Sequence, residues 1–339
     1  MNKTSIAWTE RTWNPVTGCT KYSAGCAHCY AETMAKRLQG MGQKRYANGF
    51  QLTLHPEALN EPKKVKEPSM FFVCSMADLF HKDVSDTFID FVMQTITETP
   101  RHIYQILTKR TENMYNYFAE WWCEGDFDMM PQNCWFGTTV ENADVKYRID
   151  VLRRMQNVSV KFLSCEPLLS DLGTLDLSGI DWVIVGGESG NQARPMQKEW
   201  VLNIKRQCEE QGVPFFFKQW GTYGEDGVKR NKKANGCTID GVVYQAWPKG
   251  WKGCKTNKRM AIARMIGAEW ANVMRTQYPN YLSDRIEQEK EWCAKSIELG
   301  FKEHKEEPAD GSEIEYNVID MPDGGIKIEA WREVKGGEQ

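Results

Sequence analysis

Short apolar runs alternate with segments of helical periodicity along the chain up to about residue 221. The runs are rich in β-branched and aromatic residues and are bounded by polar turns, which is typical of parallel βα units. After a first segment at residues 5–13, we expect strands at residues 70–74, 102–107, 134–139, 158–163, 182–185 and 214–217. Apolar spacing predicts helices after Cys29, after Ser85, over 145–152 and over 201–208.

The unusual polar residues collect at the C-terminal end of each predicted strand. Barrels and open α/β sheets place their active sites at this edge. Six or seven such units predict an α/β fold, and we favour a partial TIM-like barrel of the (β/α)6 type over residues 1–221.

The pattern changes from about residue 222. Residues 222–258 are rich in Gly, Lys and Asn with one candidate strand at 242–247, residues 258–300 have helical periodicity, and 313–334 predict a hairpin. We therefore expect a C-terminal α+β extension at 222–339, which would serve substrate recognition, act as a lid or support oligomerisation.

Composition indicates the size of the core, the kind of partner and the cellular location that we expect. Of 339 residues 41% are hydrophobic, which supports a sizeable core, and the net charge of −3 argues against a strongly basic nucleic-acid coat. No stretch approaches the roughly 18 consecutive apolar residues of a membrane helix. The first residues also carry no apolar run of signal-peptide length, so we expect a cytoplasmic protein with no membrane partner.

Three cysteines, Cys19, Cys26 and Cys29, lie within eleven residues of sequence. The chain has eleven cysteines and no secretory signal, which favours reduced thiols and metal ligation over a disulfide framework. Thiolates select zinc, copper(I) or iron–sulfur clusters. Structural zinc is closed by four protein ligands, whereas three cysteines on a four-iron cubane leave one iron open. The spacing favours a 4Fe–4S cluster. The alternatives are a zinc knuckle completed by His28 or a distant residue, and unrelated buried cysteines.

Charged residues and glycines at the other strand ends are the remaining candidates for chemistry. Opposed charges around one barrel mouth suit a zwitterion or a substrate bearing phosphate, although each residue could instead form a structural salt bridge or a helix cap. As candidate cofactor-binding residues we assign Asp78, His81, Lys109, Gly186, Gly187, Glu188 and Arg194. As candidate catalytic residues we assign Glu141, Glu166, Lys218 and Cys165.

Two basic stretches, at residues 63–66 and 229–233, are candidates for phosphate contacts. Tyr223 and Trp247 flank the second stretch and would offer an aromatic platform for a flipped or single-stranded base. Solvated charged loops are the commoner explanation of such sequences.

A series of motifs in order resembles the phage-associated three-cysteine-motif family of unknown function. The motifs lie at residues 13–19, 26–30, 78–81, 107–110, 137–141, 165–168, 186–190, 193–196 and 217–220. The resemblance spans about residues 6–221. The family is similar to the radical S-adenosylmethionine (SAM) superfamily, whose usual motif is C-x-x-x-C-x-φ-C. Here the first gap has six residues and His28 takes the aromatic position.

The resemblance implies a radical SAM enzyme with a 4Fe–4S cluster and SAM as cofactors. Such an enzyme cleaves SAM to methionine and a 5′-deoxyadenosyl radical, which abstracts hydrogen from the substrate, and a reductase or flavodoxin-type protein donates the electron. The phage association leads us to expect a DNA or RNA base, or a nucleotide, as substrate in modification or repair. The alternatives are a zinc-stabilised nucleic-acid-binding module without catalysis and a non-radical barrel hydrolase that uses Glu141 or Glu166 as acid and base.

Overall fold

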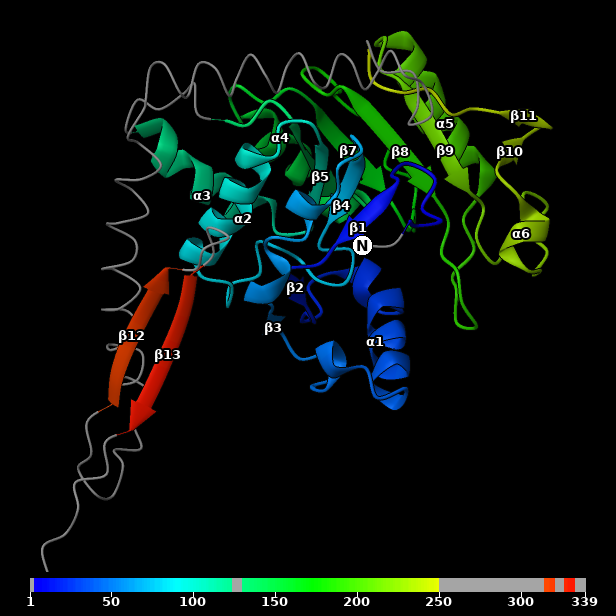
Figure 1. Cartoon of the computed structure of the whole chain (residues 1–339). Helices are drawn as coiled ribbons and strands as arrows, with labels where there is room; N and C mark the ends of the chain where they lie inside the picture. The colour runs from blue at the N-terminus through cyan, green and yellow to red at the C-terminus, as the bar shows by residue number, and fades with distance from the viewer. Residues whose placement is uncertain (1–2, 124–129, 250–313, 321–325, 333–339) are drawn as a thin grey trace, which may run out of the picture. The chain divides into compact units, whose positions relative to one another are not determined.

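The computed structural model describes residues 3–123, 130–249, 314–320 and 326–332. These residues fall into two compact units, one up to residue 272 and one from residue 273 onwards. The first unit is built on a parallel sheet of seven described strands in the order β1-β4-β5-β6-β7-β8-β9 (Figure 1). Its strands are β1 (Arg11–Trp13), β4 (Met70–Val73), β5 (Ile103–Thr108), β6 (Cys134–Thr139), β7 (Lys161–Cys165), β8 (Trp182–Gly186) and β9 (Phe215–Gln219).

This sheet confirms the predicted α/β partial barrel. The order of the strands in the sheet is also their order in the sequence, and neighbouring strands are parallel. Strands β1 and β9 form the two edges. The strands are almost completely buried, which explains why they read as continuous apolar runs rather than as an alternation of apolar and polar residues. Strand β7 begins at Lys161 rather than at Val158.

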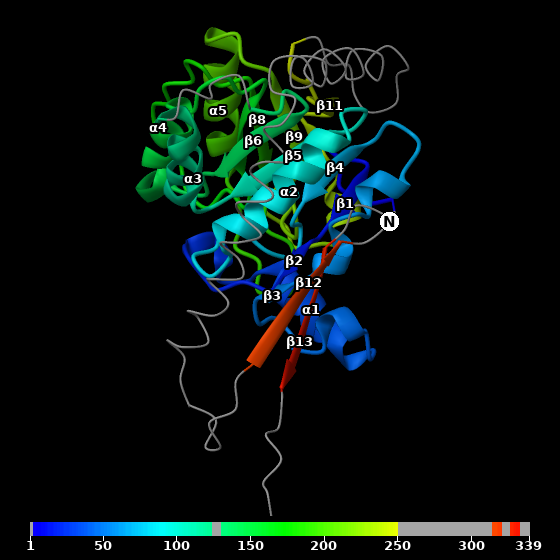
Figure 2. The same ribbon diagram turned by 60° about the vertical axis from the view of Figure 1, so that its left-hand side comes forward.

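Helices follow most of the strands. They are α1 (Tyr30–Gly40), α2 (Asp86–Glu98), α3 (Thr111–Cys123), α4 (Tyr147–Arg153), α5 (Lys198–Glu210) and the short α6 (Lys232–Asn235). Helix α2 begins after Ser85, whose hydroxyl accepts a hydrogen bond from the Phe88 amide, as its sequence predicts. Helix α3 was not among the predicted elements. Helix α1 lies beside the pair formed by β2 (Val16–Thr17) and β3 (Thr53–Leu54) (Figures 1 and 2).

Aromatic residues dominate the core on one face of the sheet. Trp8 packs against Phe72 with ring centroids 4.7 Å apart, and Trp135 meets Trp182 edge to face at 6.1 Å. The full cluster consists of Trp8, Met70, Phe72, Ile103, Trp135, Val160, Phe162, Trp182, Ile184 and Phe216. This packing joins strands β4 to β9 into one layer, so that the segments following their carboxyl ends are attached to the same core.

The segment after residue 221 continues onto the sheet. Trp247 stacks on Trp182 at 4.9 Å, and the Phe217 amide donates a hydrogen bond to the Tyr244 carbonyl. Only the first part of the candidate strand at 242–247 is a strand, β11 (Val242–Val243), which pairs with β10 (Thr238–Ile239). The boundary expected between 221 and 222 stays a prediction.

The second unit contains an antiparallel pair, β12 (Ile314–Asp320) and β13 (Ile326–Arg332), at the place of the expected hairpin. The helix expected over 258–300 lies outside the described residues. Among the helices that are described, none combines the length and the apolar character needed to cross a membrane.

Candidate functional site

The cysteine loop, defined as residues 19–29, leads from strand β2 into helix α1. Cys26 ends a 3-10 turn, and Cys29 is the N-cap of α1. All three cysteines are free and half-buried. The Cys26 thiol is close enough to Cys19 to contribute to its raised pKa, although burial is the main cause.

Residues after β4 and β5 hold the start of this loop. The buried Arg110 guanidinium donates to Asp78 Oδ2 at 3.0 Å, to the Thr20 carbonyl at 3.1 Å and to Cys19 Sγ at 3.6 Å. His81 Nε2 lies 2.7 Å from the Thr20 hydroxyl. Burial and then the Arg110 charge lower the pKa of His81, which favours a neutral imidazole as the partner of Thr20. Asp78 and His81 thus contact the groups that position Cys19.

Glu141, after β6, holds the middle of the loop. Its carboxylate is completely buried, accepts hydrogen bonds from the Ser23 hydroxyl and from the Gly25 amide at 3.2 Å, and pairs with Arg148 at 3.0 Å. Burial acts to raise the pKa of Glu141, but the Lys109 charge and these partners bring it below the usual value. The carboxylate is therefore ionised and occupied in holding the loop. Its predicted catalytic role stays a prediction.

Glu188 and Arg194, after β8, hold the end of the loop. Arg194 donates to both carboxylate oxygens of Glu188, from Nη2 at 2.6 Å and from Nε at 2.8 Å, and its Nη1 donates to the Ala24 carbonyl at 3.0 Å. His28 Nδ1 lies 3.3 Å from Glu188 Oε2. Burial acts to raise the pKa of Glu188, yet the Arg194 hydrogen bonds outweigh it and the pKa is lowered. A two-point pair of this kind fixes orientation as well as charge.

Two further residues of this arrangement were missed at the level of sequence, Tyr22 and Arg148. Two guanidinium groups lie over the Tyr22 ring, that of Arg110 at 4.8 Å from its centroid and that of Arg148 at 5.4 Å. Arg148 shares the α4 face with Ile149 and Leu152 and is 1% exposed. An arginine on a face that is otherwise apolar was the available signal, because a buried arginine requires a partner carboxylate.

Glu166 and Lys218 form an ion pair of 2.9 Å at the ends of β7 and β9, and both are partly exposed. Ser164 donates a further hydrogen bond to Glu166 at 3.2 Å. The Cys165 thiol is completely buried, and burial raises its pKa well above the usual value. The structure therefore leaves Glu166 and Lys218 accessible to a bound molecule, whereas Cys165 packs in the core. The catalytic roles of all three stay predictions.

Close packing explains why residues 186 and 187 are both glycine in this fold. A Cβ on Gly187 would lie 1.9 Å from the Trp220 carbonyl oxygen, and one on Gly186 would lie 2.6 Å from Glu166 Oε1. The space beside both glycines is thus filled by this chain's own atoms. The cofactor contact predicted for them stays a prediction.

The donor set of the cysteine loop fits an iron–sulfur cluster. Three free thiols are the ligands that such clusters use, and an N–H donor on a ligand sulfur, here Arg110 on Cys19, is one of the groups that tune them. Across the described ranges, no three His, Cys, Asp or Glu side chains form a group that could hold a single metal ion. The case for a cluster therefore depends on the chemistry of the three thiols and on how the loop is held.

Comparisons with solved structures give only distant likenesses. A cysteine-to-serine mutant of spore photoproduct lyase matches with 14% identity and a TM-score of 0.35, over 60% of this chain and 62% of that chain. The same enzyme complexed with dinucleoside spore photoproduct matches with 11% identity and a TM-score of 0.32, over 62% of this chain and 65% of that one. This chain therefore spans less than two thirds of the length of these structures. At such scores the likeness carries no argument about function.

Comparisons of sequence identify the family of the chain. A search of the curated proteins finds no match. A family model described as "Protein of unknown function (DUF5131)" matches residues 3–248, which include the whole seven-stranded sheet and the cysteine loop. The match covers well over half of the chain, and the chain belongs to the DUF5131 family of proteins of unknown function.

Proposed function

We propose that this protein is a radical SAM enzyme in which Cys19, Cys26 and Cys29 hold a 4Fe–4S cluster and SAM binds beside it. One observation carries the proposal. Three free thiols lie on a single loop, and two buried ion pairs and one partly buried pair from the carboxyl ends of parallel strands hold that loop in place. When bound and reduced, a cluster of this kind supplies the electron that cleaves SAM to methionine and a 5′-deoxyadenosyl radical.

The protein's own residues would hold the three thiols ready for the cluster. Burial raises the pKa of Cys19, and Arg110, which places a positive charge beside the Cys19 sulfur, opposes that rise. Glu141 and Glu188 fix the loop at Gly25 and, through Arg194, at Ala24. A loop ordered before the cluster binds loses less conformational entropy when the cluster is inserted.

The partly exposed ion pair of Glu166 and Lys218 is our candidate for contact with the bound reactants. Its two charges match the amino and carboxylate groups of a zwitterion such as methionine, and both side chains are partly accessible. Lys109 lies close enough to Glu141 to lower the pKa of its carboxyl. We propose that SAM or the substrate binds among these residues at the carboxyl edge of the sheet.

We propose a nucleic-acid base or a nucleotide as the substrate, and a reductase or flavodoxin-type protein as the electron donor. A nucleic-acid substrate is supported by the basic segment 229–233, which belongs to the part of the chain that follows strand β9. A base acted on by such an enzyme must leave any duplex, since its reacting atoms are otherwise inside the stack.

The test is anaerobic purification followed by analysis of iron, sulfide and zinc, with visible spectra before and after dithionite. The proposal expects about four irons per chain, a brown colour that bleaches on reduction, and 5′-deoxyadenosine formed from SAM. Cys26→Ser should lose iron and activity, whereas Cys237→Ser, at another half-buried free cysteine outside the loop, should keep both. A colourless protein with one zinc would establish the binding module instead. Activity that survives Cys26→Ser would establish the hydrolase.

A further inference from the structure

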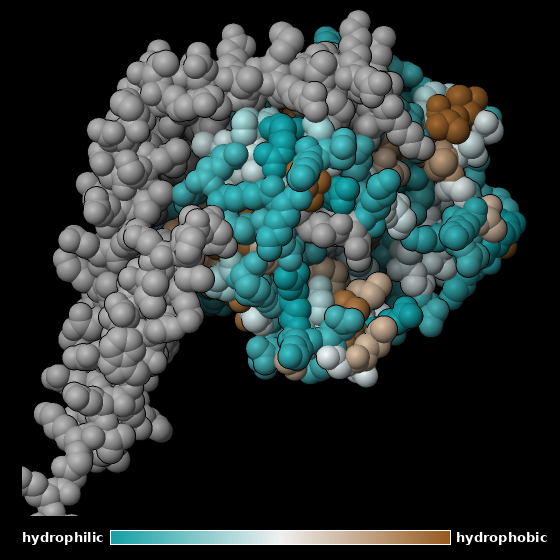
Figure 3. All heavy atoms as spheres, viewed as in Figure 1, coloured by the Kyte–Doolittle hydropathy of each residue, from teal (hydrophilic) through white to brown (hydrophobic). Residues whose placement is uncertain are grey.

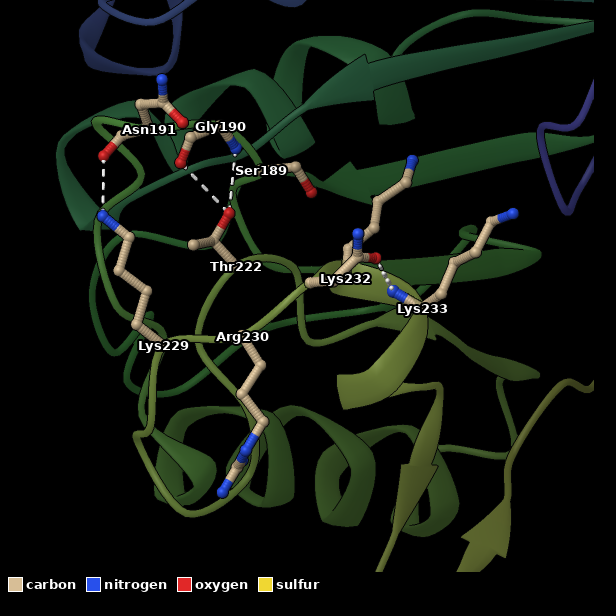
Figure 4. Close-up of a pocket in the computed structure, with 9 residues that line it drawn as sticks. Ser189, Gly190, Asn191, Thr222, Lys229, Arg230, Lys232 and Lys233 are labelled. Carbon is tan, nitrogen blue, oxygen red and sulfur yellow. Dashed lines mark hydrogen bonds between the residues drawn. The ribbon is translucent and has the colours of Figure 1, made fainter.

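A pocket of about 490 Å³ lies beside the end of strand β8 and is lined by cationic residues (Figure 4). We call it the lysine pocket. One wall consists of Ser189, Gly190 and Asn191, and the other of Thr222 and residues 229–233. Its volume is within the range of sites that bind small molecules or one or two units of a polymer.

The two walls are joined by Thr222. Its hydroxyl accepts a hydrogen bond from the Gly190 amide at 2.9 Å and donates to the Gly190 carbonyl at 3.2 Å, as Figure 4 shows. The Thr222 amide donates to the Glu188 carbonyl at 2.9 Å. Glu188 is the residue that pairs with Arg194 and so holds the cysteine loop. The first wall of the lysine pocket is therefore the direct continuation of the site described above.

The lysine-bearing wall is also held by its own hydrogen bonds. The Asn231 side chain accepts from the Lys233 amide at 2.9 Å, at the start of α6. Asn235 Nδ2 donates to the carbonyls of Gly221 at 3.0 Å and Thr222 at 2.9 Å. These contacts fix the backbone that carries the cations, so the pocket is part of the fold of this unit.

Of the four cationic side chains that line the pocket, Arg230 is paired with a carboxylate, whereas Lys229, Lys232 and Lys233 are not paired with one in the described structure. Arg230 is neutralised by Asp226, with contacts of 2.8 and 2.6 Å. Lys229 Nζ donates to the Asn191 carbonyl at 3.1 Å, which leaves its charge in place. In the part of the chain that the structure describes, no carboxylate pairs with Lys232 or Lys233.

The nearby acids do not cancel this charge. Glu225 pairs with Lys198 at 2.7 Å, and Asp240 pairs with the same lysine. In the view of Figure 3 the described surface around α6 is mostly hydrophilic. The lysine pocket is thus lined by three lysines whose charges no described carboxylate neutralises, together with the hydroxyl of Ser189 and the amide of Asn191.

We propose that the lysine pocket binds the phosphate groups of a single nucleic-acid strand, whose base would reach the cysteine loop. This deepens the proposed function, on which it rests, by naming a strand rather than a free nucleotide as substrate. Lysine ammonium groups are point charges that suit phosphate oxygens. Several cations along one pocket suit a chain of phosphates, and hydroxyl and amide donors are common partners of the same oxygens.

The test is the binding of a fluorescein-labelled 12-nucleotide single strand to the full-length protein, followed by anisotropy at 50 and 200 mM salt. Each phosphate contact to a single strand contributes a slope of roughly −0.7 to the logarithmic salt dependence. Three contacts therefore predict binding about 20-fold weaker at the higher salt, and one contact about threefold weaker. Because the double variant Lys232→Gln, Lys233→Gln keeps only one of the three contacts, its binding should weaken about threefold between 50 and 200 mM salt rather than about 20-fold.

The matched control is Lys64→Gln, Lys66→Gln, which removes the same charge from the other basic stretch, where both lysines are exposed. The proposal expects this control to bind and respond to salt as the unmodified protein does. Equal losses in both double variants, or no binding at all, would overturn the lysine pocket as the site. Tighter binding of ATP than of the 12-mer would overturn a strand as its ligand.

Binding needs neither iron nor SAM, so the two proposals fail separately. If the protein lacks iron but the lysine pocket variant loses the strand, the radical mechanism falls and the pocket stands. If the protein has a cluster and forms 5′-deoxyadenosine but does not bind a strand, the pocket proposal falls and the enzyme class stands.

Discussion

Arg110 donates a hydrogen bond to the sulfur of Cys19 at 3.6 Å, although 91 residues of sequence separate the two. The same guanidinium pairs with Asp78 at 3.0 Å, and both side chains of this pair are buried. One buried ion pair therefore links the ends of β4 and β5 to the first cysteine of the loop. Similar pairs at Glu141 and Glu188 hold its later residues.

Arg110→Met should destabilise the protein because it leaves the Asp78 carboxylate buried without its partner. Removal of one member of a buried pair costs about 3–5 kcal/mol. The measurement is urea unfolding of the cluster-free protein. The double variant Arg110→Met, Asp78→Leu should recover part of the loss, and an additive loss in the double variant would contradict the coupling. Iron content after reconstitution should fall in the single variant.

Glu141→Gln should loosen the middle of the cysteine loop. The Gly25 amide loses a charged acceptor, and Arg148 loses the carboxylate with which it pairs at 3.0 Å. Hydrogen exchange of a peptide covering residues 20–28 should become faster. Glu209→Gln, which breaks only the exposed pair with Lys205 on α5, should leave that peptide unchanged. Unaltered exchange in Glu141→Gln would show that the loop is held by other contacts.

His102 should make stability depend on pH between about 6.5 and 4. The Ser69 amide donates to its Nδ1 at 3.2 Å, and Nε2 lies 3.2 Å from the Pro62 carbonyl, so the neutral ring satisfies both groups. Burial lowers the pKa of His102 to about 4, against about 6.5 in an unfolded chain.

The sign of this effect follows from which state binds the proton. Above pH 6.5 neither state is protonated at His102 and its contribution is fully present. As the pH falls from 6.5 to 4, the unfolded chain binds the proton first, and about 3 kcal/mol of stability is lost. The free energy of unfolding, measured with urea, should differ less between pH 7 and pH 4.5 in His102→Gln than in the unmodified protein. An identical difference would contradict this prediction.

Gly187→Ala should be strongly destabilising, because its Cβ would lie 1.9 Å from the Trp220 carbonyl oxygen, and a backbone atom cannot rotate away. We expect a loss of about 3 kcal/mol, at the upper end for overpacking. The control is Gly40→Ala at the end of α1, where a Cβ meets nothing within 4 Å. A fall in thermal midpoint no larger for Gly187→Ala than for Gly40→Ala would show that β8 and β9 can separate at this point.

Local patterns predicted the sheet well because its strands are covered on both faces. The run Met70–Val73 is apolar throughout, and β6 coincides with the predicted segment although it ends in two buried threonines. The Ser85 cap and the apolar face of α2 followed from spacing alone, since both depend on neighbours within one or two turns. Helix α3 was missed, although Phe118 on its inner face is completely buried.

The sequence by itself determined the parallel βα order, the three thiols in one loop and the collection of charged residues at strand ends. Each of these depends on residues that are close together in the chain. Only the tertiary structure decided which charges meet, because Ser23 and Glu141 are 118 residues apart and Arg194 is 170 residues from Ala24. Such pairs exist only once the strands have aligned, and their burial gives the carboxylates the task of holding the cysteine loop.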